Sequence, residues 1–209
     1  MSMILYSYWR SSCSWRVRIG LHLKQVEFKT VPVNLLEGEH QDTPHISRNA
    51  LGQVPVLELG DGTQIRQSLA ILDWLDRTHP LPPLFPSDPV AGATALSLAE
   101  IVNAGIQPLQ NLAVLKAIEA LGGDRTQWGR EVIERGLQAL AKHAKPTAGA
   151  FLVGDTVSIA DLCLVPQLYN ARRFGCDLSS VGLLTEIEAR CNALPSFQAA
   201  HPDNQPDAK

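Results

Sequence analysis

Short apolar stretches separated by polar turns fill the first third of the chain. Three of them are too short for ordinary helices and are rich in aliphatic and aromatic residues, which predicts strands and a hairpin: residues 3–8 (MILYSY), 27–35 (EFKTVPVNL) and 54–65 (VPVLELGDGTQI). A Gly-Asp-Gly triplet supplies the hairpin turn. Leucines then recur at helical spacing over residues 69–78, with Ser68 as the expected N-cap, and this helix must end before Pro80.

Residues 15–23 (WRVRIGLHL) give a conflicting signal. Apolar side chains occupy every odd position, a strict alternation that predicts a strand. However, a strand–turn–helix order would make better use of the Ser-Ser-Cys turn that precedes them, and no turn signal separates them from residues 3–8. Gly20 weakens either assignment. The pattern alone therefore leaves strand and helix open.

Proline marks the clearest boundary in the chain. Residues 79–89 (HPLPPLFPSDP) contain five prolines, so neither a helix nor a central strand can run through them. Four later stretches have helical periodicity: residues 90–123, 127–146, 158–174 and 183–195. In the third, Ser158 and Asp161 have the spacing of a capping box. We therefore expect an N-terminal α/β domain, a proline-rich linker and an all-helical domain, over residues 1–80, 81–89 and 90–209.

Composition and charge narrow the classes of function. Hydrophobic residues make up 45% of the 209-residue chain and charged residues 19%, as in ordinary globular proteins. The net charge of −3 does not indicate a nucleic-acid or anionic-membrane partner, and we expect neither a signal peptide nor a membrane span. The four cysteines lack CxxC spacing and the six histidines lack an HExxH motif. We therefore expect reduced thiols, a cytoplasmic location and no metal site.

The polar turn at residues 10–13 (RSSC) carries the strongest candidate chemistry. If it lies between a strand and a helix, its backbone N–H groups face an anion site at the positive end of the helix dipole. The hydroxyls of Ser11 and Ser12 can donate to a thiolate or a carboxylate, although simple helix capping is the alternative use. Cys13 could be a nucleophile, but protein disulfide chemistry would need a second cysteine nearby.

Two further segments suggest sites for an anion or a peptide. A cis bond between Val54 and Pro55 would leave the backbone N–H and C=O of Val54 as a short strand edge for a peptide-like ligand. Gln67 and Ser68 stand at a second expected helix N-terminus, which could hold a carboxylate. The alternatives are an ordinary trans proline and an ordinary helix cap. Together with the turn at residues 10–13, the two segments are more suggestive than any one of the three alone.

Six segments together resemble the zeta class of the glutathione transferase family: SSCSWRVRIGL, QVPVLEL, QSLAILDWL, GIQPLQNLAVL, GDTVSIADLCLVPQ and FGCDL. They occur in order over nearly the whole chain. The resemblance implies the glutathione transferase fold, which joins an α/β thioredoxin-like N-terminal domain of order βαβαββα to an all-α C-terminal domain. It implies that residues 15–23 form the first helix. It also implies glutathione as the cofactor and a homodimer.

The resemblance also assigns expected roles to individual residues. Ser11 matches the serine that faces the glutathione sulfur, and Ser12 and Cys13 complete that catalytic motif. Contacts to glutathione are implied for six further residues, with Gln41 as the alternative to the first: His40, Val54, Gln67, Ser68, Gln107 and Asn111. Arg10 and Arg173 match arginines that face the substrate carboxylates.

The activity implied by the resemblance is glutathione-dependent cis–trans isomerisation of maleylacetoacetate, a small dicarboxylate, to fumarylacetoacetate. Isomerisation of maleylpyruvate, and transfer or dehalogenation of α-halo acids, are the alternatives. Members of the class that act on maleylpyruvate tend to carry threonine at the Cys13 position and arginines where this chain has Leu112 and Ala113. Both departures favour maleylacetoacetate. A non-catalytic binding module should lack the hydroxyls and thiol found at residues 11–13.

Overall fold

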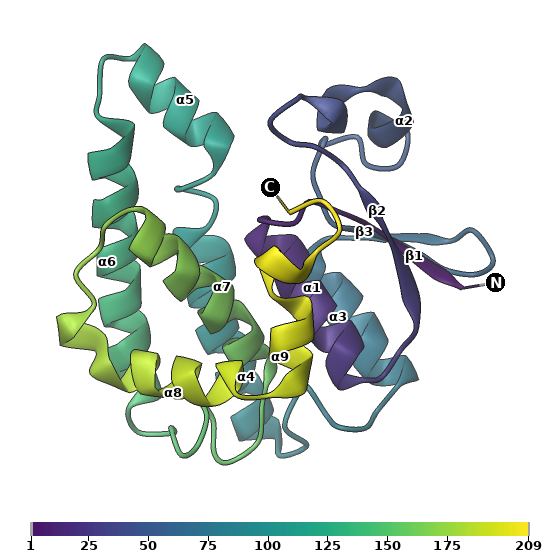
Figure 1. Ribbon diagram of the computed structural model, residues 1–209. Helices are drawn as coiled ribbons and strands as arrows, with labels where there is room; N and C mark the ends of the chain where they lie inside the picture. The colour runs from purple at the N-terminus through teal and green to yellow at the C-terminus, as the bar shows by residue number, and fades with distance from the viewer. Residues whose placement is uncertain (1, 209) are drawn as a thin grey trace. The chain divides into compact units, whose positions relative to one another are not determined.

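The computed structural model describes residues 2–208 and divides them into two compact units (Figure 1). One division falls between Leu84 and Phe85, inside the predicted linker. The other falls between Ala193 and Leu194, so the residues from Leu194 onward belong to the same unit as the N-terminal part. This differs from the predicted domain over residues 90–209, which placed them in the helical half. The first unit is mixed α/β and the second is helical, so the predicted fold class is confirmed.

A mixed four-stranded sheet organises the first unit, in the order β2-β1-β3-β4. Its strands are β1 (Met3–Ser7), β2 (Phe28–Pro32), β3 (Val56–Glu58) and β4 (Gln64–Arg66). β1 is parallel to β2 and antiparallel to β3, where Leu5 lies opposite Leu57. The antiparallel pair of β3 and β4 confirms the predicted hairpin.

The two faces of the sheet bury different apolar side chains. Leu5 and its partner Leu57 are fully buried on one face. The residues next to them point to the other face, because side chains alternate along a strand. They join a cluster of five buried residues: Tyr6, Tyr8, Val33, Val54 and Val56. This cluster connects the end of β1 with the segment that leads into β3.

Helix α1 (Ser12–Leu23) contains the ambiguous residues 15–23, so the strand alternative is wrong and the helix implied by the resemblance is confirmed. Every residue from Ser14 to Leu21 is buried, and Arg16 and Arg18 are both 0% exposed. The polar positions in the alternation therefore do not mark a solvent face. A helix that is buried all round does not need polar residues on one face and apolar residues on the other, so its sequence lacks an amphipathic pattern.

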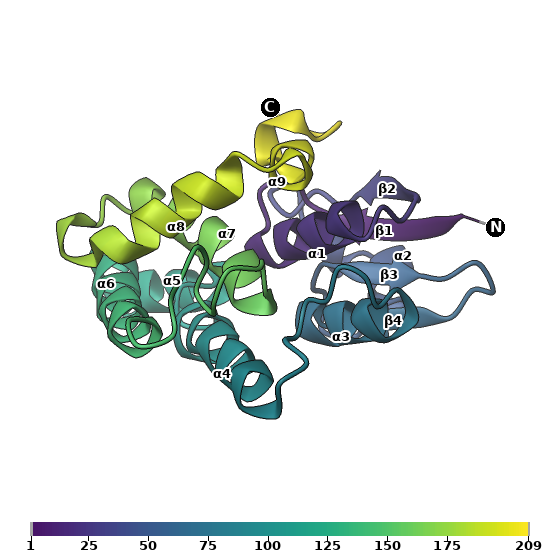
Figure 2. The ribbon, with the colours of Figure 1, turned by 90° about the horizontal axis from the view of Figure 1, so that it is seen from below.

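The C-terminal residues supply part of the cover over α1. Helix α9 (Pro195–Ala200) packs along α1, and α3 (Ser68–Thr78) packs on α1 as well. Figure 2 shows α9 and α1 side by side. The rings of Trp15 and His201 meet edge to face with their centroids 5.2 Å apart. Three shorter helical turns complete this unit: η1 (Glu39–Gln41), α2 (Thr43–Ile46) and η4 (Pro202–Asn204).

The second unit consists of helices, as predicted from the periodicity. They are α4 (Pro89–Glu100), the π-helical η2 (Ile101–Ile106), α5 (Leu112–Ala120), α6 (Arg125–Ala144), α7 (Ile159–Arg173), η3 (Ser179–Val181) and α8 (Gly182–Asn192). The predicted stretch 90–123 is interrupted around Pro108, as expected. Gly122 follows α5 with a φ of +84°, a left-handed conformation that favours glycine. α7 packs against α4 and α8.

The predicted capping box at the start of α7 is present. Oδ2 of Asp161 accepts the N–H of Ser158 at 2.8 Å and its hydroxyl at 2.9 Å. Oδ1 accepts the N–H of Leu152 at 2.9 Å. Burial raises the pKa of Asp161 to about 6, although these hydrogen bonds favour the ionised form. The box therefore ties a buried carboxylate to the loop that precedes α7.

One segment in the described part of the chain, Pro89–Ile106, is long and apolar enough to cross a membrane by length and composition alone. Its mean hydropathy is 1.3 over 18 residues, and 28% of that window is buried. From the sequence we expect no membrane span. It is not an unbroken apolar run, because it contains Ser97, Glu100 and Asn103. A single helix of this kind is a weak indication of a membrane span, since helices of globular proteins pass the same test.

Candidate active site

Ser11 occupies the N-cap of α1, at the end of the β1–α1 turn (residues 8–11). Its backbone is extended, with φ −68° and ψ 120°, and its N–H donates to the carbonyl of Tyr8 at 3.0 Å. Its Oγ accepts the N–H of Ser14 at 3.3 Å. A hydroxyl can accept and donate at once, so the Ser11 hydroxyl can still donate to a negatively charged atom in front of the helix. Helix capping and sulfur contact are therefore compatible uses of this side chain.

The other residues predicted for this turn lie directly beside Ser11. Ser12 and Cys13 are the first two residues of α1, Ser12 buried at 7% exposure and Cys13 half-buried. The first-turn N–H groups of a helix point along its axis and form its positive end. Arg10 is half-buried, with its guanidinium carbon 5.1 Å from the centroid of the Trp9 ring. Residues 10–13 thus gather hydroxyls, a thiol and a cation at one helix end.

Val54 offers backbone groups to a ligand. Its bond to Pro55 is cis, as the sequence hypothesis required, and its side chain packs in the cluster with Tyr8. β3 begins only at Val56, and within residues 2–208 neither the N–H nor the C=O of Val54 has a hydrogen-bond partner. Buried peptide groups of this kind suit a ligand that itself carries peptide groups.

Gln67 and Ser68 lie at the N-terminus of α3, one position away from the expected arrangement. Gln67 is the N-cap and Ser68 the first helical residue, so the prediction of Ser68 as N-cap is wrong. Gln67 has a φ of +67°, uncommon for a residue other than glycine, and its side chain makes no capping hydrogen bond. The first amides of α3 therefore have no side-chain acceptor from the N-cap, an arrangement that suits an external carboxylate.

Arg16 contributes a positive charge that the sequence did not reveal. It follows Ser12 by one helical turn on α1 and is fully buried. Its Nη1 donates to Oγ of Ser68 at 3.4 Å. A buried cation therefore joins α1 to the start of α3. In the sequence Arg16 is merely one polar position of the alternating segment, which carries no sign of its burial.

The loop that holds His40 lies against the segment leading to Val54. His40 is half-buried in η1, and its carbonyl oxygen would lie 2.9 Å from a Cβ atom at Gly52. Gly52 has a φ of +60°, so both its conformation and this close approach require glycine. Gln41, the alternative contact, is exposed, and its side chain also faces Gly52.

In the second unit, Gln107 and Asn111 lie in the turn between η2 and α5. Gln107 is half-buried at the end of η2, and Asn111 is the exposed N-cap of α5. Oδ1 of Asn111 accepts the N–H of Ala113 at 3.1 Å, which leaves its Nδ2 group as a donor for a ligand. Between them, the buried Gln110 exchanges two hydrogen bonds with Gln167 of α7, at 2.9 and 3.3 Å. This amide pair fixes the turn to α7.

The two arginines that end α7 have different surroundings. Arg172 makes a bidentate ion pair with Glu188 of α8, at 2.6 and 2.5 Å, and the Glu188 side chain is only 7% exposed. Arg173 is exposed, and its Nη1 donates to Oδ1 of Asn170 at 3.2 Å. Consecutive residues on a helix lie about 100° apart, so the two side chains point in different directions. Arg173 is therefore the better placed of the two to meet a ligand from solvent.

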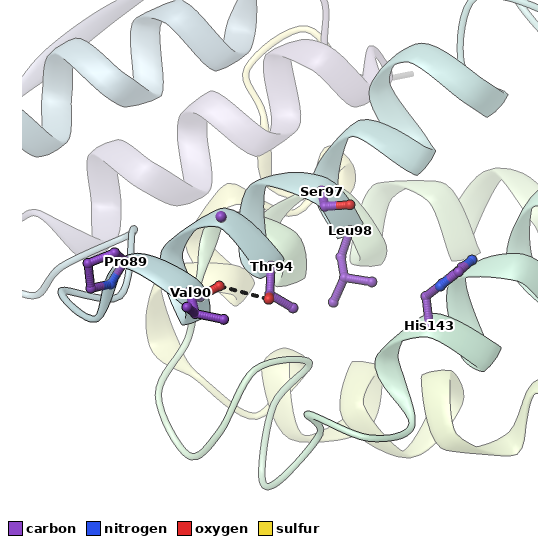
Figure 3. A pocket seen from close by; sticks show the side chains of 7 residues that line it. Pro89, Val90, Thr94, Ser97, Leu98 and His143 are labelled. Carbon is purple, nitrogen blue, oxygen red and sulfur yellow. Dashed lines mark hydrogen bonds between the residues drawn. The ribbon is translucent and has the colours of Figure 1, made fainter.

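A hollow of about 450 Å³ lies on the second unit, but it contains none of the predicted site residues. Helix α4 supplies most of its lining, and His143 of α6 completes it. Figure 3 shows Val90, Thr94 and Leu98 around this hollow, with the hydroxyl of Thr94 donating to the carbonyl of Val90 at 2.8 Å. The lining is mainly apolar and comes almost entirely from α4, which is unlike a site for a charged substrate.

Comparison with protein families identifies the chain. The model of the glutathione S-transferase N-terminal domain matches residues 1–77, and that of the C-terminal domain matches residues 62–183. The chain belongs to the glutathione transferase family. Among curated relatives of this transferase, maleylacetoacetate isomerase from Mus musculus is 48% identical over 206 residues, which cover 98% of this chain and 94% of the mouse protein.

Solved structures place this transferase in the zeta class. Maleylacetoacetate isomerase from Anaeromyxobacter dehalogenans, with glutathione bound in its active site, is 48% identical with a TM-score of 0.92 and covers 100% of this chain and 98% of that one. A second structure of it holds dicarboxyethyl glutathione and citrate, with a TM-score of 0.91. A holo maleylpyruvate isomerase, described as a bacterial zeta-class glutathione transferase, is 34% identical with a TM-score of 0.95, covering 99% and 100%.

Glutathione is the cofactor of this family, and the first unit of the transferase fits it. The tripeptide carries a thiol, peptide groups and a γ-glutamyl carboxylate. The hydroxyl of Ser11 suits the thiol, and the unpartnered backbone of Val54 suits the peptide groups. The start of α3, with Arg16 behind Ser68, suits the carboxylate. Gln107, Asn111 and Arg173 belong to the second unit.

Proposed function

We propose that the chain catalyses the glutathione-dependent isomerisation of maleylacetoacetate to fumarylacetoacetate, a step of tyrosine and phenylalanine catabolism. The observation that carries the proposal is the Ser11 hydroxyl, placed at the N-cap of α1 where it can donate to a thiolate. The mouse maleylacetoacetate isomerase, 48% identical over nearly the whole chain, supports the choice of reaction. The enzyme is thus a cis–trans isomerase built on a transferase fold.

Ser11 and the end of α1 lower the pKa of the bound thiol. A cysteinyl thiol has a pKa of about 8.5, and lowering it by ~2 units requires ~2.7 kcal/mol of preferential stabilisation of the thiolate. A hydrogen bond to a charged group contributes about 1.5–3 kcal/mol. The positive end of a helix adds about 0.3–1 kcal/mol. Together these two contributions are of the required size, so the proposed mechanism uses no general base.

The remaining contacts hold the ends of the tripeptide. The N–H and C=O of Val54 pair with the cysteinyl backbone. Gln67, Ser68 and the first amides of α3 bind the γ-glutamyl carboxylate, with Arg16 adding positive charge from beneath. Ser12 and Cys13 complete the thiol site, and three further donors serve the rest of the molecule: His40, Gln107 and Asn111.

Arg10 and Arg173 bind the carboxylates of the substrate. Bound glutathione would supply the thiolate for a reversible addition to the cis double bond, which would allow rotation about the resulting single bond. Arg10 lies next to Ser11, so its charge also stabilises the negative charge that develops on the substrate during addition. The dicarboxyethyl glutathione in the Anaeromyxobacter relative supports a site that accepts glutathione together with a dicarboxylate.

Maleylpyruvate is the second candidate substrate, because a maleylpyruvate isomerase has a TM-score of 0.95 with this chain. The positions expected to hold arginines for that substrate carry Leu112 and Ala113, both exposed at the start of α5. Neither side chain can bind a carboxylate. Together with Cys13, they favour maleylacetoacetate.

The enzyme acts in the cytoplasm as a homodimer. Helix α4 supports this assembly, because Val90 and Leu96 are 74% and 40% exposed and the apolar hollow of Figure 3 lies along the same helix. Exposed apolar side chains on a helix are often covered by another subunit.

An ultraviolet assay of maleylacetone isomerisation tests the reaction. We expect isomerisation in the presence of glutathione and none above background in its absence. Maleylpyruvate and an α-chloro acid, assayed in parallel, should be slower substrates as judged by kcat/KM. Activity independent of glutathione would reject the mechanism, and a higher kcat/KM for maleylpyruvate would favour the second candidate.

A further inference from the structure

Arg18 is a fully buried cation on α1 that the mechanism above does not use. Its Nη2 donates to the carbonyl of Trp9 at 2.8 Å. Its Nη1 donates to the hydroxyl of Ser7 at 3.0 Å and lies 3.5 Å from the carbonyl of Tyr8. Its Nε donates to the carbonyl of Ala200 in α9 at 3.2 Å. Three of these four acceptors lie where β1 leads into the β1–α1 turn, so the guanidinium fixes the entry to that turn.

Asp207 holds the same backbone from the C-terminal segment. Its Oδ2 accepts the N–H of Trp9 at 3.0 Å. Burial lowers the pKa of Arg18 to about 9, and the charge of Asp207 acts in the opposite direction. Within residues 2–208, Oδ1 of Asp207 is buried without a hydrogen-bond partner. The buried carboxylate is instead stabilised by the electrostatic attraction between Asp207 and Arg18. Both peptide groups of Trp9 are therefore held, the N–H by Asp207 and the C=O by Arg18.

Geometry explains the presence of these charges better than stability does. Burying a guanidinium carries a desolvation cost that an apolar side chain would avoid. A guanidinium, however, fixes several acceptors at once, because its donors lie in one plane with fixed directions. Arg10 and Ser11 follow Trp9 directly, so the orientation of the Trp9 peptide groups determines the backbone position of these two residues. A displacement of about 1 Å in a catalytic group can reduce a rate by about 10².

We propose that Arg18 and Asp207 are positioning residues for the isomerase reaction, acting through the peptide groups of Trp9 to place Arg10 and the hydroxyl of Ser11. This inference rests on the proposed function. It assigns a role in the reaction to residues 194–208, for which the family resemblance implied no role. Ser11 would remain the group that touches the sulfur.

Four variants separate positioning from folding. Asp207→Ala removes the acceptor of the Trp9 N–H, whereas Asp207→Asn keeps an oxygen acceptor without the charge. Arg18→Lys keeps a charge but loses the planar set of donors. Asp203→Ala is the matched control, because Asp203 is an exposed aspartate of the same segment whose carboxylate faces His201. The Asp207 variants decide the test if Arg18→Lys does not fold.

Each variant is measured well below its melting temperature, for turnover of maleylacetone, glutathione affinity and the pH titration of the bound thiolate by ultraviolet absorbance. Asp207→Ala should lower kcat about tenfold and raise the pKa of the bound thiol by about one unit, because the donors around the sulfur are displaced. Its Kd for glutathione should change by less than about threefold. Asp207→Asn should recover most of the loss, and Arg18→Lys should lose at least as much as Asp207→Ala.

An unchanged kcat and thiolate titration in Asp207→Ala, even with a lower melting temperature, would show that the contacts are only structural. Equal losses in Asp203→Ala would also overturn the inference. Failure of the proposed function would look different, because the wild-type protein itself would not isomerise maleylacetone. The thiolate titration of the variants would then still decide the positioning role, since it needs glutathione binding alone.

Discussion

The Ser11 oxygen accepts the N–H of Ser14, and its hydroxyl can donate to a bound sulfur. Ser11→Ala removes both interactions, so two separate losses are expected. Turnover of maleylacetone should fall by a factor of ~10² to 10⁴, the range for losing a positioned donor. The free energy of unfolding should fall by about 1 kcal/mol, because a helix cap is lost. Steady-state kinetics and urea unfolding measure the two effects.

Two controls isolate the chemical effect of Ser11. Asp88→Ala removes another N-cap, whose side chain accepts the N–H of Ala91 at 2.8 Å, and should lower stability without lowering turnover.

Cys13→Ala should keep isomerase activity while changing the affinity for substrate or glutathione, because this turn contains no second cysteine for redox chemistry. Wild-type turnover in Ser11→Ala would reject the assigned role.

Arg173 and Arg172 provide a paired test of substrate binding. Arg173→Ala should raise KM for the dicarboxylate, because a hydrogen bond to a charged group contributes about 1.5–3 kcal/mol, while glutathione affinity stays nearly unchanged. From the sequence alone, Arg172→Ala should do little. Its ion pair with the buried Glu188 changes this expectation to a loss of about 1–3 kcal/mol in the free energy of unfolding.

Kinetic constants and urea unfolding of both variants distinguish the two roles. Similar kinetic effects of the two substitutions would contradict the assignment of Arg173 to the substrate. So would a loss of glutathione affinity in Arg173→Ala.

Among single residues, the sequence could indicate those that a motif contains, such as Ser11, Val54 and Arg173. It could not indicate Arg16 or Arg18, because a buried arginine and an exposed one look the same in a pattern of polar and apolar positions. It also misplaced the cap of α3 by one residue, since Ser68 is a favoured N-cap residue but its hydroxyl accepts from Arg16 instead. The burial of these arginines and the position of the α3 cap depend on contacts between residues far apart in the sequence.

At the scale of elements, the capping box of α7 gives a prediction about pH. Burial raises the pKa of Asp161 from 3.8 to about 6, so the folded protein binds this proton more tightly than the unfolded chain does. The stability that this proton contributes is fully present at pH values below the ordinary pKa of 3.8. It is lost as the pH rises through the raised pKa of about 6. As the pH falls from about 7 to about 5, the free energy of unfolding of the wild type should therefore rise relative to that of Asp161→Asn.

Urea unfolding at several pH values measures this difference. The hydrogen bonds lost in Asp161→Asn give a constant offset, so the slope with pH carries the test. A difference that did not change with pH would show that Asp161 keeps its ordinary pKa in the folded protein.

The sheet and most helices could be predicted from periodicity, whereas α1 could not. The strands and the hairpin have one recognisable pattern each, and α4 to α8 have apolar residues at helical spacing. In α1, the residues from Ser14 to Leu21 are buried on all sides, so polar and apolar positions say nothing about its faces. The family resemblance supplied the helix that the physical pattern left open.

At the scale of the whole molecule, the exposed apolar residues of α4 give a prediction about assembly. The double substitution Val90→Lys, Leu96→Lys should convert a homodimer to a monomer, because it would place two charges at exposed apolar positions of the helix proposed to form the interface. Sedimentation equilibrium measures the mass. Leu121→Lys, at an 85% exposed leucine next to α5, is the control and should leave the mass unchanged. A wild-type monomer, or a dimer in the double variant, would contradict the proposed α4 interface.

The predicted domain over residues 90–209 also differs from the structure at its C-terminal end, because a sequence pattern does not say which partner a segment packs against. Residues 194–208 lie in the first unit, although they follow directly on the helices of the second. Their contacts to α1, through Trp15 and Arg18, join residues more than 180 positions apart in the sequence. No local pattern encodes a contact over that separation.

This arrangement has a consequence for how the protein is made. The first unit is assembled from two separated stretches, with residues 85–193 between them. During synthesis, the complete helical unit therefore leaves the ribosomal exit tunnel before α9 and Asp207 do. The helical unit can fold at a time when the first unit still lacks its last helix. Until then, the side of α1 that α9 covers stays open to water or to a chaperone. The turn that carries Ser11 is thus expected to be among the last parts of the nascent chain to reach its final form.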